Sequence, residues 1–285
     1  MPATPSKRRF LTTWRWTAVA LIAGVAMLSG CADRAGTALQ IAKGGELSPE
    51  TMAAGRFDLR LFTRIDPAAS ALAIYLEGDG RAWIRRDRLS DDPTPIDPVA
   101  LRLAAADPTT SVAYIARPCQ FMGGAEARGC APRYWSGDRY APEVVEALNE
   151  AVEELRRRAG SPPVTLVGYS GGGTLALLLA DRMRPGDRVI TVAAVVDTDA
   201  WTAWHRVTPL AGSLNPIHAY TGSSGVAAVH FVGGQDDIVP PALTEAAMVR
   251  LPAAARPLNR VERIDDFDHA CCWAREWPAI IARLR

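Results

Sequence analysis

The stretch Val164-Thr165-Leu166-Val167-Gly168-Tyr169-Ser170-Gly171-Gly172 decides the fold of this 285-residue chain. Residues 164–167 form a short apolar run typical of a buried strand, and a helical pattern follows over 173–184. The junction matches G-x-S-x-G, in which small neighbours leave the hydroxyl of a serine exposed on a sharp strand-to-helix turn. The N-terminus of the following helix places free N–H groups beside developing negative charge. The pattern therefore predicts that Ser170 is a nucleophile, the alternative being a glycine-rich helix start capped by serine.

Short apolar runs alternate with helical patterns on both sides of this junction. Strands are predicted at 72–76, 112–116, 164–167, 189–196 and 226–232, with a weaker one at 260–264 and an edge strand at 56–65. Helices are predicted at 142–158, with Pro142 as its first residue, and at 173–184, 241–250 and 272–285. Continuously apolar short strands suit a parallel sheet that is covered on both faces. We therefore expect an α/β fold with a mostly parallel central sheet and helices on both faces.

Two long segments depart from the short connections of such a fold. They cover residues 81–110 and 198–225, and each follows a predicted strand. Loops this long inside a domain tend to be functional or mobile. In an open α/β sheet they lie above the carboxyl edge of the strands, where ligands bind.

The first thirty residues have the layout of a secretory signal. Three basic residues at 7–9 precede an apolar stretch over 14–28, which ends in Leu28-Ser29-Gly30-Cys31. These four residues resemble a bacterial lipobox, and the resemblance implies that Cys31 is lipidated and anchors the chain to a membrane; an ordinary signal peptide or an uncleaved anchor is the alternative. The predicted organisation is a signal peptide at 1–30, a linker at 31–54 and one domain at 55–285. The resemblance to bacterial lipoproteins implies that Ala32, rather than Asp, after the cysteine favours the outer membrane, with the body of the protein in the periplasm.

The composition argues against several classes of function. The formal net charge is +1 and no basic patch is present, so no nucleic-acid partner is expected. Outside the signal, no apolar run is long enough to span a bilayer. No metal-ligand or nucleotide-binding motif is present, so neither a metal nor a cofactor is expected.

A serine hydroxyl needs an adjacent base, and the chain has only four histidines. His230 lies inside a predicted buried strand, while His205 and His218 lie in the second long segment. His269 follows the last predicted strand and precedes the closing helix. His269 is therefore the candidate base.

Five motifs together resemble a group of bacterial lipoproteins with the α/β-hydrolase fold. The resemblance spans about residues 55–285 and implies a catalytic triad, esterase-like chemistry and a small-molecule or lipid-like acyl substrate, but no particular substrate. The motifs are Glu77-Gly78-Asp79-Gly80, Arg117-Pro118-Cys119-Gln120, Gly168-Tyr169-Ser170-Gly171-Gly172, Gly234-Gln235-Asp236 and His269-Ala270-Cys271-Cys272-Trp273.

The resemblance also implies a role for several residues. The turn at 234–240 is similar to the acid turn of the fold, which selects Asp236; Asp237 is the runner-up, and Asp197 or Asp199 is less favoured. The order Ser, Asp, His agrees with the α/β-hydrolase order. The oxyanion donors are expected to be the amide of Gly171 and an amide of Asp79 or Gly80, while the side chain of Asp79 is expected to fix the loop. A plain Gly-Asp-Gly turn is the alternative.

The remaining cysteines, Cys119, Cys130, Cys271 and Cys272, make an even number in an oxidising compartment. We favour a Cys119–Cys130 disulfide, which closes the loop after a predicted strand. Cys271 and Cys272 then form a vicinal pair with an unusually short Cα separation. Pairing between the two loops is the alternative.

The expected chemistry is acyl transfer to water through an acyl-serine. The tryptophans of the long segments and of the loop before 142 are candidates for an apolar acyl pocket or for ordinary packing: Trp83, Trp135, Trp201 and Trp204. One alternative is a peptidase or an envelope deacylase on the same residues. Another is a catalytically silent hydrolase fold that serves as a binding or assembly lipoprotein.

Overall fold

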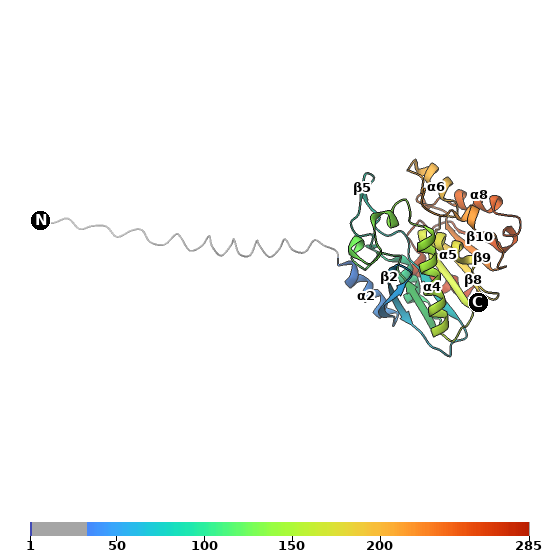
Figure 1. The fold of residues 1–285 in the computed structure, drawn as a ribbon, viewed down its shortest axis with the longest axis horizontal. Helices are drawn as coiled ribbons and strands as arrows, with labels where there is room; N and C mark the ends of the chain where they lie inside the picture. The colour runs from blue at the N-terminus through green and yellow to red at the C-terminus, as the bar shows by residue number, and fades with distance from the viewer. Residues whose placement is uncertain (2–32, 285) are drawn as a thin grey trace. The chain divides into compact units, whose positions relative to one another are not determined.

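An eight-stranded sheet organises the computed structural model, which describes Met1 and residues 33–284 (Figure 1). The strand order is β1-β2-β6-β3-β7-β8-β9-β10. β2 is antiparallel to both of its neighbours, and every pair from β6 to β10 is parallel. The strands of this sheet are β1 (Ser48–Ala54), β2 (Phe57–Arg64), β3 (Leu72–Leu76), β6 (Ser111–Ile115), β7 (Val164–Tyr169), β8 (Arg188–Val192), β9 (Ala227–Gly233) and β10 (Asn259–Ile264).

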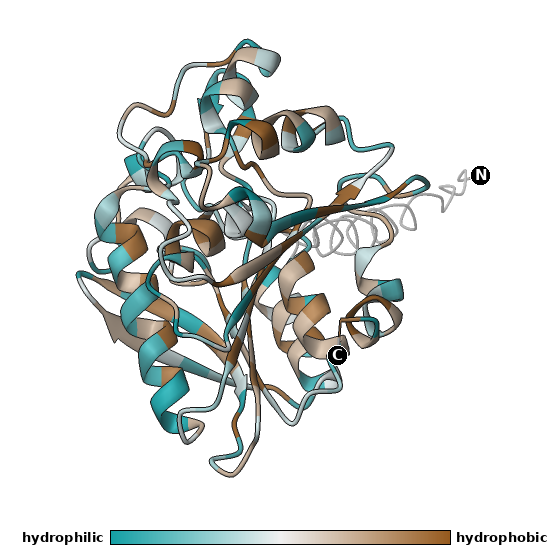
Figure 2. Cartoon of the chain, turned by 90° about the vertical axis from the view of Figure 1, so that its right-hand side faces the viewer, coloured by the Kyte–Doolittle hydropathy of each residue, from teal (hydrophilic) through white to brown (hydrophobic). Residues whose placement is uncertain are grey.

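Helices cover both faces of the sheet, and Figure 2 shows their hydrophobic sides toward the strands. The helices are α2 (Arg34–Gly44), α3 (Val99–Ala106), α4 (Pro142–Arg158), α5 (Gly171–Ala180), α6 (Thr198–His205), α7 (Pro216–Ala219), α8 (Pro241–Arg250) and α9 (Trp273–Ala282). The alternation of side chains along a strand divides the core in two. Leu72, Ile74 and Leu76 of β3 pack on the face of α4 and α5, whereas Ala73 and Tyr75 pack on the face of α2, α3 and α9.

Both cores lie inside the compact unit Arg34–Arg285. Every strand of the central sheet also belongs to this unit. This unit therefore holds both cores and the complete sheet, and we expect residues 32–285 to fold independently.

The predicted architecture is confirmed, and two helices, at 142–158 and 241–250, have the predicted bounds. The linker prediction is wrong for its larger part, because residues 34–44 form α2 and residues 48–54 form β1. β1 pairs along its whole length with β2, so β1 is the edge strand and β2 is an inner strand. The sequence of β1 has no aromatic residue, valine or isoleucine and gave no strand signal, because pairing with β2 rather than intrinsic propensity fixes its conformation.

The two long segments contain secondary structure of their own. Residues 81–110 hold a small hairpin, β4 (Trp83–Arg85) with β5 (Arg88–Leu89), followed by α3. Residues 198–225 hold α6 and α7. Both segments follow parallel strands of the sheet or their connecting loops, and both contribute to the site described below.

The predicted signal peptide at 1–30 and the lipidated Cys31 lie outside the described residues apart from Met1. Among the residues that are described, no helix has the length and hydrophobicity needed to cross a bilayer.

Candidate active site

Ser170 occupies a sharp turn between β7 and α5. Its φ of 50° and ψ of −122° lie in a region that non-glycine residues rarely adopt. Glycines make the turn possible: a side chain on Gly168 would meet the carbonyl of Gly172 at 2.2 Å, and one on Gly172 would meet the carbonyl of Leu76 at 2.2 Å. The serine hydroxyl is consequently half-buried at the carboxyl end of the central strand β7.

His269 lies beside this serine, in the loop between β10 and α9. Its Nε2 is 3.2 Å from Ser170 Oγ, within hydrogen-bonding reach of a nucleophile and its base. The backbone carbonyl of His269 accepts hydrogen bonds of 3.1 Å from Tyr169 and Trp273, which fix the loop on the core. These contacts hold the imidazole over the serine without contacting its two nitrogens.

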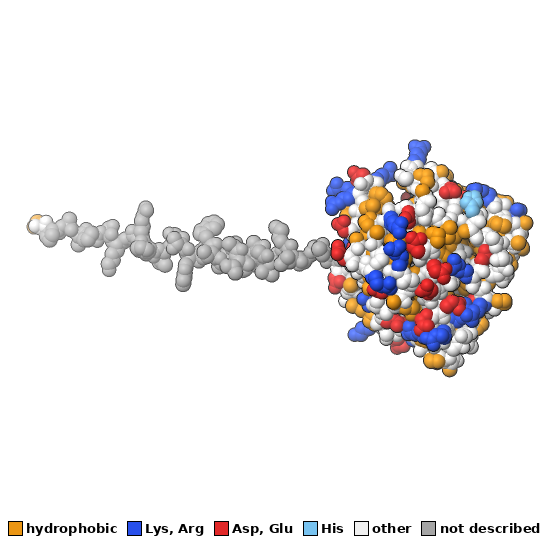
Figure 3. Space-filling model, viewed as in Figure 1, with side chains coloured by type: hydrophobic (Ala, Val, Ile, Leu, Met, Phe, Trp, Pro, Cys, Tyr) orange, Lys and Arg blue, Asp and Glu red, His pale blue; other side chains and the backbone are white. Residues whose placement is uncertain are grey.

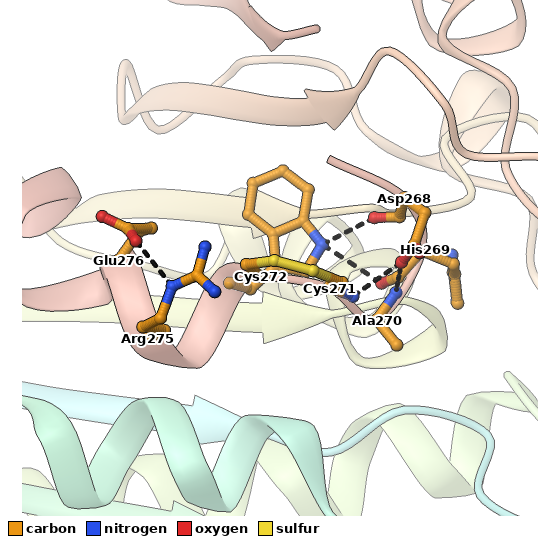
Figure 4. Close-up of a disulfide and its surroundings, with 8 residues drawn as sticks. Asp268, His269, Ala270, Cys271, Cys272, Arg275 and Glu276 are labelled. Carbon is orange, nitrogen blue, oxygen red and sulfur yellow. Dashed lines mark hydrogen bonds and ion pairs between the residues drawn. A yellow bond between two sulfur atoms is a disulfide. The ribbon is translucent and has the colours of Figure 1, made fainter. Parts of the chain in front are cut away.

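Figure 4 shows how the loop after His269 closes on itself. The carboxylate of Asp268 accepts hydrogen bonds from the amides of Ala270, at 2.8 Å, and Cys271, at 2.6 Å. Cys271 and Cys272 form a disulfide, as do Cys119 and Cys130. The favoured cysteine pairing is therefore the one in the structure.

Asp236 orients the imidazole from its other side. Its Oδ2 lies 2.8 Å from His269 Nδ1, and because a carboxylate only accepts, Nδ1 carries the proton. Its Oδ1 accepts hydrogen bonds from the amides of Ile238 and Val239 at 2.9 and 2.7 Å. The side chain is completely buried, so both oxygens have fixed partners. Nε2 is then left free to accept the proton of Ser170.

The competing acids and histidines have other surroundings. Asp237 is exposed, and Asp197 caps α6 and pairs with Arg250. His230 is fully buried between Thr191 and Asn259, and burial lowers its pKa to about 4. Asp197 and His230 therefore support the fold, and neither they nor Asp237 contacts Ser170.

Asp199 and the two remaining histidines complete the set of alternatives. The Nε2 of His205 lies 2.8 Å from the carbonyl of Ile238. His218 is exposed beside Asp199, which is also exposed. None of the three contacts Ser170 or His269 among the described residues.

The loop at 78–80 lies against the serine, as the oxyanion prediction requires. A side chain on Gly78 would come within 3.3 Å of Ser170 Cβ. Gly171 is the first residue of α5, and the first N–H groups of a helix have no partner inside it. In the loop, the amide of Gly78 is occupied by Glu77 and that of Arg81 by Pro93, whereas the amides of Asp79 and Gly80 make no hydrogen bond within residues 33–284.

The carboxylate of Asp79 points away from this role and anchors the loop. It forms ion pairs with Arg117 and Arg139 and accepts a hydrogen bond of 3.2 Å from the hydroxyl of Tyr140. Burial alone would raise the pKa of Asp79, but the charges of Arg139 and Arg117 outweigh it and hold the pKa below the ordinary 3.8. Gln120 adds a 2.9 Å hydrogen bond to the carbonyl of Gly78.

Apart from Asp79, the residues that anchor this loop were not predicted from the sequence to have a role in the site. Arg117 and Gln120 were part of a recognised motif without an assigned role, and Arg139 and Tyr140 carried no signal. Three separate segments, 77–80, 117–120 and 139–140, meet at this loop, so only the folded chain brings the group together. The predicted function of the Asp79 side chain as a support of the loop agrees with this geometry.

A cleft of about 490 Å³ opens above the serine. Its volume is in the range of small-molecule sites. Two of the four candidate tryptophans, Trp83 and Trp201, line it together with Ile96, Ile238 and Val239. Trp135 is instead buried, with its indole nitrogen bonded to Ser90, and Trp204 is exposed outside the cleft. Among the described residues no cluster of acidic, histidine or cysteine side chains could hold a metal ion.

The strand order, the single antiparallel strand β2 and the position of Ser170 after β7 define the class of protein: the chain has the α/β-hydrolase fold. No protein-family model matches the sequence, and no curated protein matches it. Solved structures, in contrast, do match the chain.

Three of the similar structures illustrate the relationship. An α/β serine hydrolase homologue from Coxiella burnetii has a TM-score of 0.57 and 14% identity, over 83% of this chain and 96% of that one. An esterase from Pyrococcus furiosus has a TM-score of 0.55 and 15% identity, over 85% and 90%. A membrane phospholipase A, a bacterial virulence factor, has a TM-score of 0.56 and 14% identity, over 94% and 96%. At sequence identities this low, the structural similarity establishes the fold alone.

Proposed function

We propose that the protein is a serine hydrolase that cleaves carboxylic esters through an acyl-serine intermediate. The observation that carries the proposal is the arrangement of one imidazole between two partners, with Nε2 3.2 Å from Ser170 Oγ and Nδ1 2.8 Å from Asp236 Oδ2. This geometry allows His269 to take a proton from the serine while Asp236 stabilises the resulting cation.

The reaction has two stages. In the first, Ser170 Oγ attacks the ester carbonyl, its proton moves to His269 Nε2, and the amides of Gly171 and of Asp79 or Gly80 bind the oxyanion. The tetrahedral intermediate expels the alkoxide, which takes the proton from Nε2. In the second, water gives a proton to Nε2 and attacks the acyl-serine. The bond between the acyl carbon and Oγ then breaks, Oγ takes the proton back from Nε2, and the acid is released.

The walls of the cleft favour an ester with an apolar acyl group. Trp83, Ile96, Trp201, Ile238 and Val239 present apolar surface beside the serine. Burial of an apolar chain against such walls is favourable. The solved structures with the same fold include one named an esterase and one named a phospholipase A, which adds support to an ester over a peptide.

Fluorophosphonate labelling of purified residues 32–285 tests the proposal. We expect labelling of the wild-type protein and loss of labelling in Ser170→Ala and in His269→Ala. A screen of p-nitrophenyl esters of increasing chain length then defines the acyl preference. A folded wild-type protein that does not react would refute the activated serine and direct attention to binding functions.

We also propose that the protein is exported and lipid-anchored at Cys31, in the outer membrane and facing the periplasm. The basic and apolar segments before Cys31 support export. Two disulfides in the folded unit suit an oxidising compartment. Labelled palmitate should be incorporated by the full chain expressed in bacteria and not by its Cys31→Ser variant; equal incorporation would refute the anchor.

A further inference from the structure

Exposed hydrophobic side chains gather around the mouth of the cleft. The described residues include nine large hydrophobic side chains that are exposed, and six of them lie on segments that border the cleft. Their exposed fractions run from 37% to 59%. The six are Trp83, Ile84, Ile96, Trp204, Val207 and Ile238. Concentration of exposed apolar surface at one place marks an interaction site.

Two elements carry most of this surface, which we call the mouth surface. The hairpin β4–β5 provides Trp83 and Ile84, and it forms a small sheet separate from the central one. α6 provides Trp204 on the other side, and Val207 lies two residues after the end of this helix. Side-chain contacts fix α6 to the rim, because the indole nitrogen of Trp201 donates to the carbonyl of Ile238 at 2.8 Å.

Arginines surround the apolar side chains of the hairpin. Residues 81–89 contain Arg81, Arg85, Arg86 and Arg88 with a single acid, Asp87. None of these four arginines takes part in an ion pair within the described part of the chain. In Figure 3 blue and orange side chains lie together at the corner where Figure 1 labels β5.

We propose that the mouth surface docks on a bilayer containing anionic phospholipid and that the cleft takes its ester from that bilayer. Unpaired arginines complement anionic headgroups, while tryptophan and isoleucine side chains enter the interface. A cleft that opens between them receives an acyl chain without exposing it to water. The docking proposal depends only on the residues of the mouth surface. The phospholipid ester as substrate class rests on the proposed hydrolase function.

Binding is measured with residues 32–285 carrying Ser170→Ala, so that no turnover is needed. Flotation with vesicles of phosphatidylglycerol and phosphatidylcholine is compared with flotation of pure phosphatidylcholine vesicles. We expect binding only to the anionic vesicles, and weaker binding at high salt. Equal binding to both vesicles, or binding to neither, would overturn the docking proposal and leave a protein partner for this surface.

Matched variants locate the contact. Arg85→Ala, Arg86→Ala and Arg88→Ala together should weaken binding on the order of 100-fold. The control removes the same charge from other exposed arginines, Arg157→Ala, Arg182→Ala and Arg184→Ala, and should change binding by less than about threefold. Equal weakening by both triple variants would show general charge attraction and refute the assignment of the surface.

The apolar part is tested with side chains outside the cleft lining. Ile84→Ala with Trp204→Ala should weaken binding on the order of tenfold. Leu39 and Val249 are also exposed but belong to α2 and α8 and are not part of the mouth surface. The control pair Leu39→Ala with Val249→Ala should therefore leave vesicle binding unchanged. If neither pair affects binding, the interface contains no apolar contact and the proposed mode is wrong.

The substrate class needs an active serine. With Ser170 intact, the hairpin triple variant should release less fatty acid from anionic vesicles but keep the wild-type kcat/KM on a soluble p-nitrophenyl ester. A protein that hydrolyses the soluble ester and binds vesicles but releases no fatty acid refutes the phospholipid substrate. A protein that binds vesicles but does not react with fluorophosphonate refutes the hydrolase function and leaves the docking intact.

Discussion

Replacement of Asp79 by alanine is the sharpest test of how the oxyanion loop is held. The change removes the carboxylate that pairs with Arg117 and Arg139, whose side chains are only 5% and 8% exposed. Removal of one partner from a buried ion pair costs about 3–5 kcal/mol, since the other charge stays buried. Because a quarter of the Asp79 side chain is exposed, water can partly replace it, and we expect a loss of about 3 kcal/mol in the free energy of unfolding.

The same change should reduce turnover. Without the carboxylate, the amides of Asp79 and Gly80 lose the anchor that directs them toward the oxyanion. Loss of one oxyanion donor costs about 10²–10³ in kcat. We therefore expect kcat on a p-nitrophenyl ester to fall about 100-fold for Asp79→Ala with little change in KM, because the contact forms mainly in the transition state.

Urea unfolding and steady-state kinetics measure the two effects. Asp58→Ala is a suitable control, because Asp58 pairs with Arg128 at the surface, where such pairs contribute at most about 1 kcal/mol. A folded-state pKa of Asp79 below 3.8 means that its stabilisation is present above that pH and is lost as the pH falls further. If Asp79→Ala loses less than about 1 kcal/mol in the free energy of unfolding at pH 7, or keeps a kcat within twofold of wild type, the anchoring role is refuted.

Three further predictions concern the acid, a buried glutamate and the first disulfide. Asp236→Asn should lower kcat on the order of 10⁴-fold, because the amide nitrogen would face Nδ1 of His269 and move the proton to Nε2; kinetics of the folded variant would decide this. Burial raises the pKa of Glu77 to about 7, so its stabilisation is complete below about pH 4.5 and is lost as the pH rises through 7. Between pH 5 and pH 8 the free energy of unfolding should therefore fall by about 3 kcal/mol more in the wild type than in Glu77→Gln. Parallel pH profiles of the two proteins would contradict this expectation. Cys119→Ser with Cys130→Ser should lower the free energy of unfolding by about 3 kcal/mol in urea titration, and an unchanged value would show that the loop is ordered without the bond.

The strands and helices that the sequence revealed are those whose own residues decide their conformation. β3 and β7 are short apolar runs, and α4 begins at a proline that suits the first turn of a helix. β1 was missed because it has no aromatic residue, valine or isoleucine and its conformation depends on pairing with β2. α3 was missed although Val99–Ala106 is rich in good helix formers, a signal that was available inside the first long segment.

The residues of the candidate site also fall into two groups, those that a local motif predicts and those that only the folded chain brings together. Ser170, Asp236 and His269 each belong to a local motif next to a predicted strand, so sequence order was enough to select them, and the structure brings the three side chains together. The anchor of the oxyanion loop could not be predicted, because Arg139 reaches Asp79 across 60 residues of sequence. A long-range ion pair leaves no pattern in one sequence. It depends on where the packed layers place both side chains.

Three large apolar residues of the cleft wall, Trp83, Ile96 and Trp201, come from different parts of the chain than its reactive groups. Ser170, Asp236 and His269 follow β7, β9 and β10, whereas the hairpin β4–β5 and α6 belong to the two long segments. Selection can therefore alter the shape and charge of the entrance while the reactive centre stays constant, which lets a lineage change substrates without losing chemistry. Mutant libraries designed to reshape the entrance should for the same reason be confined to 81–98 and 199–215.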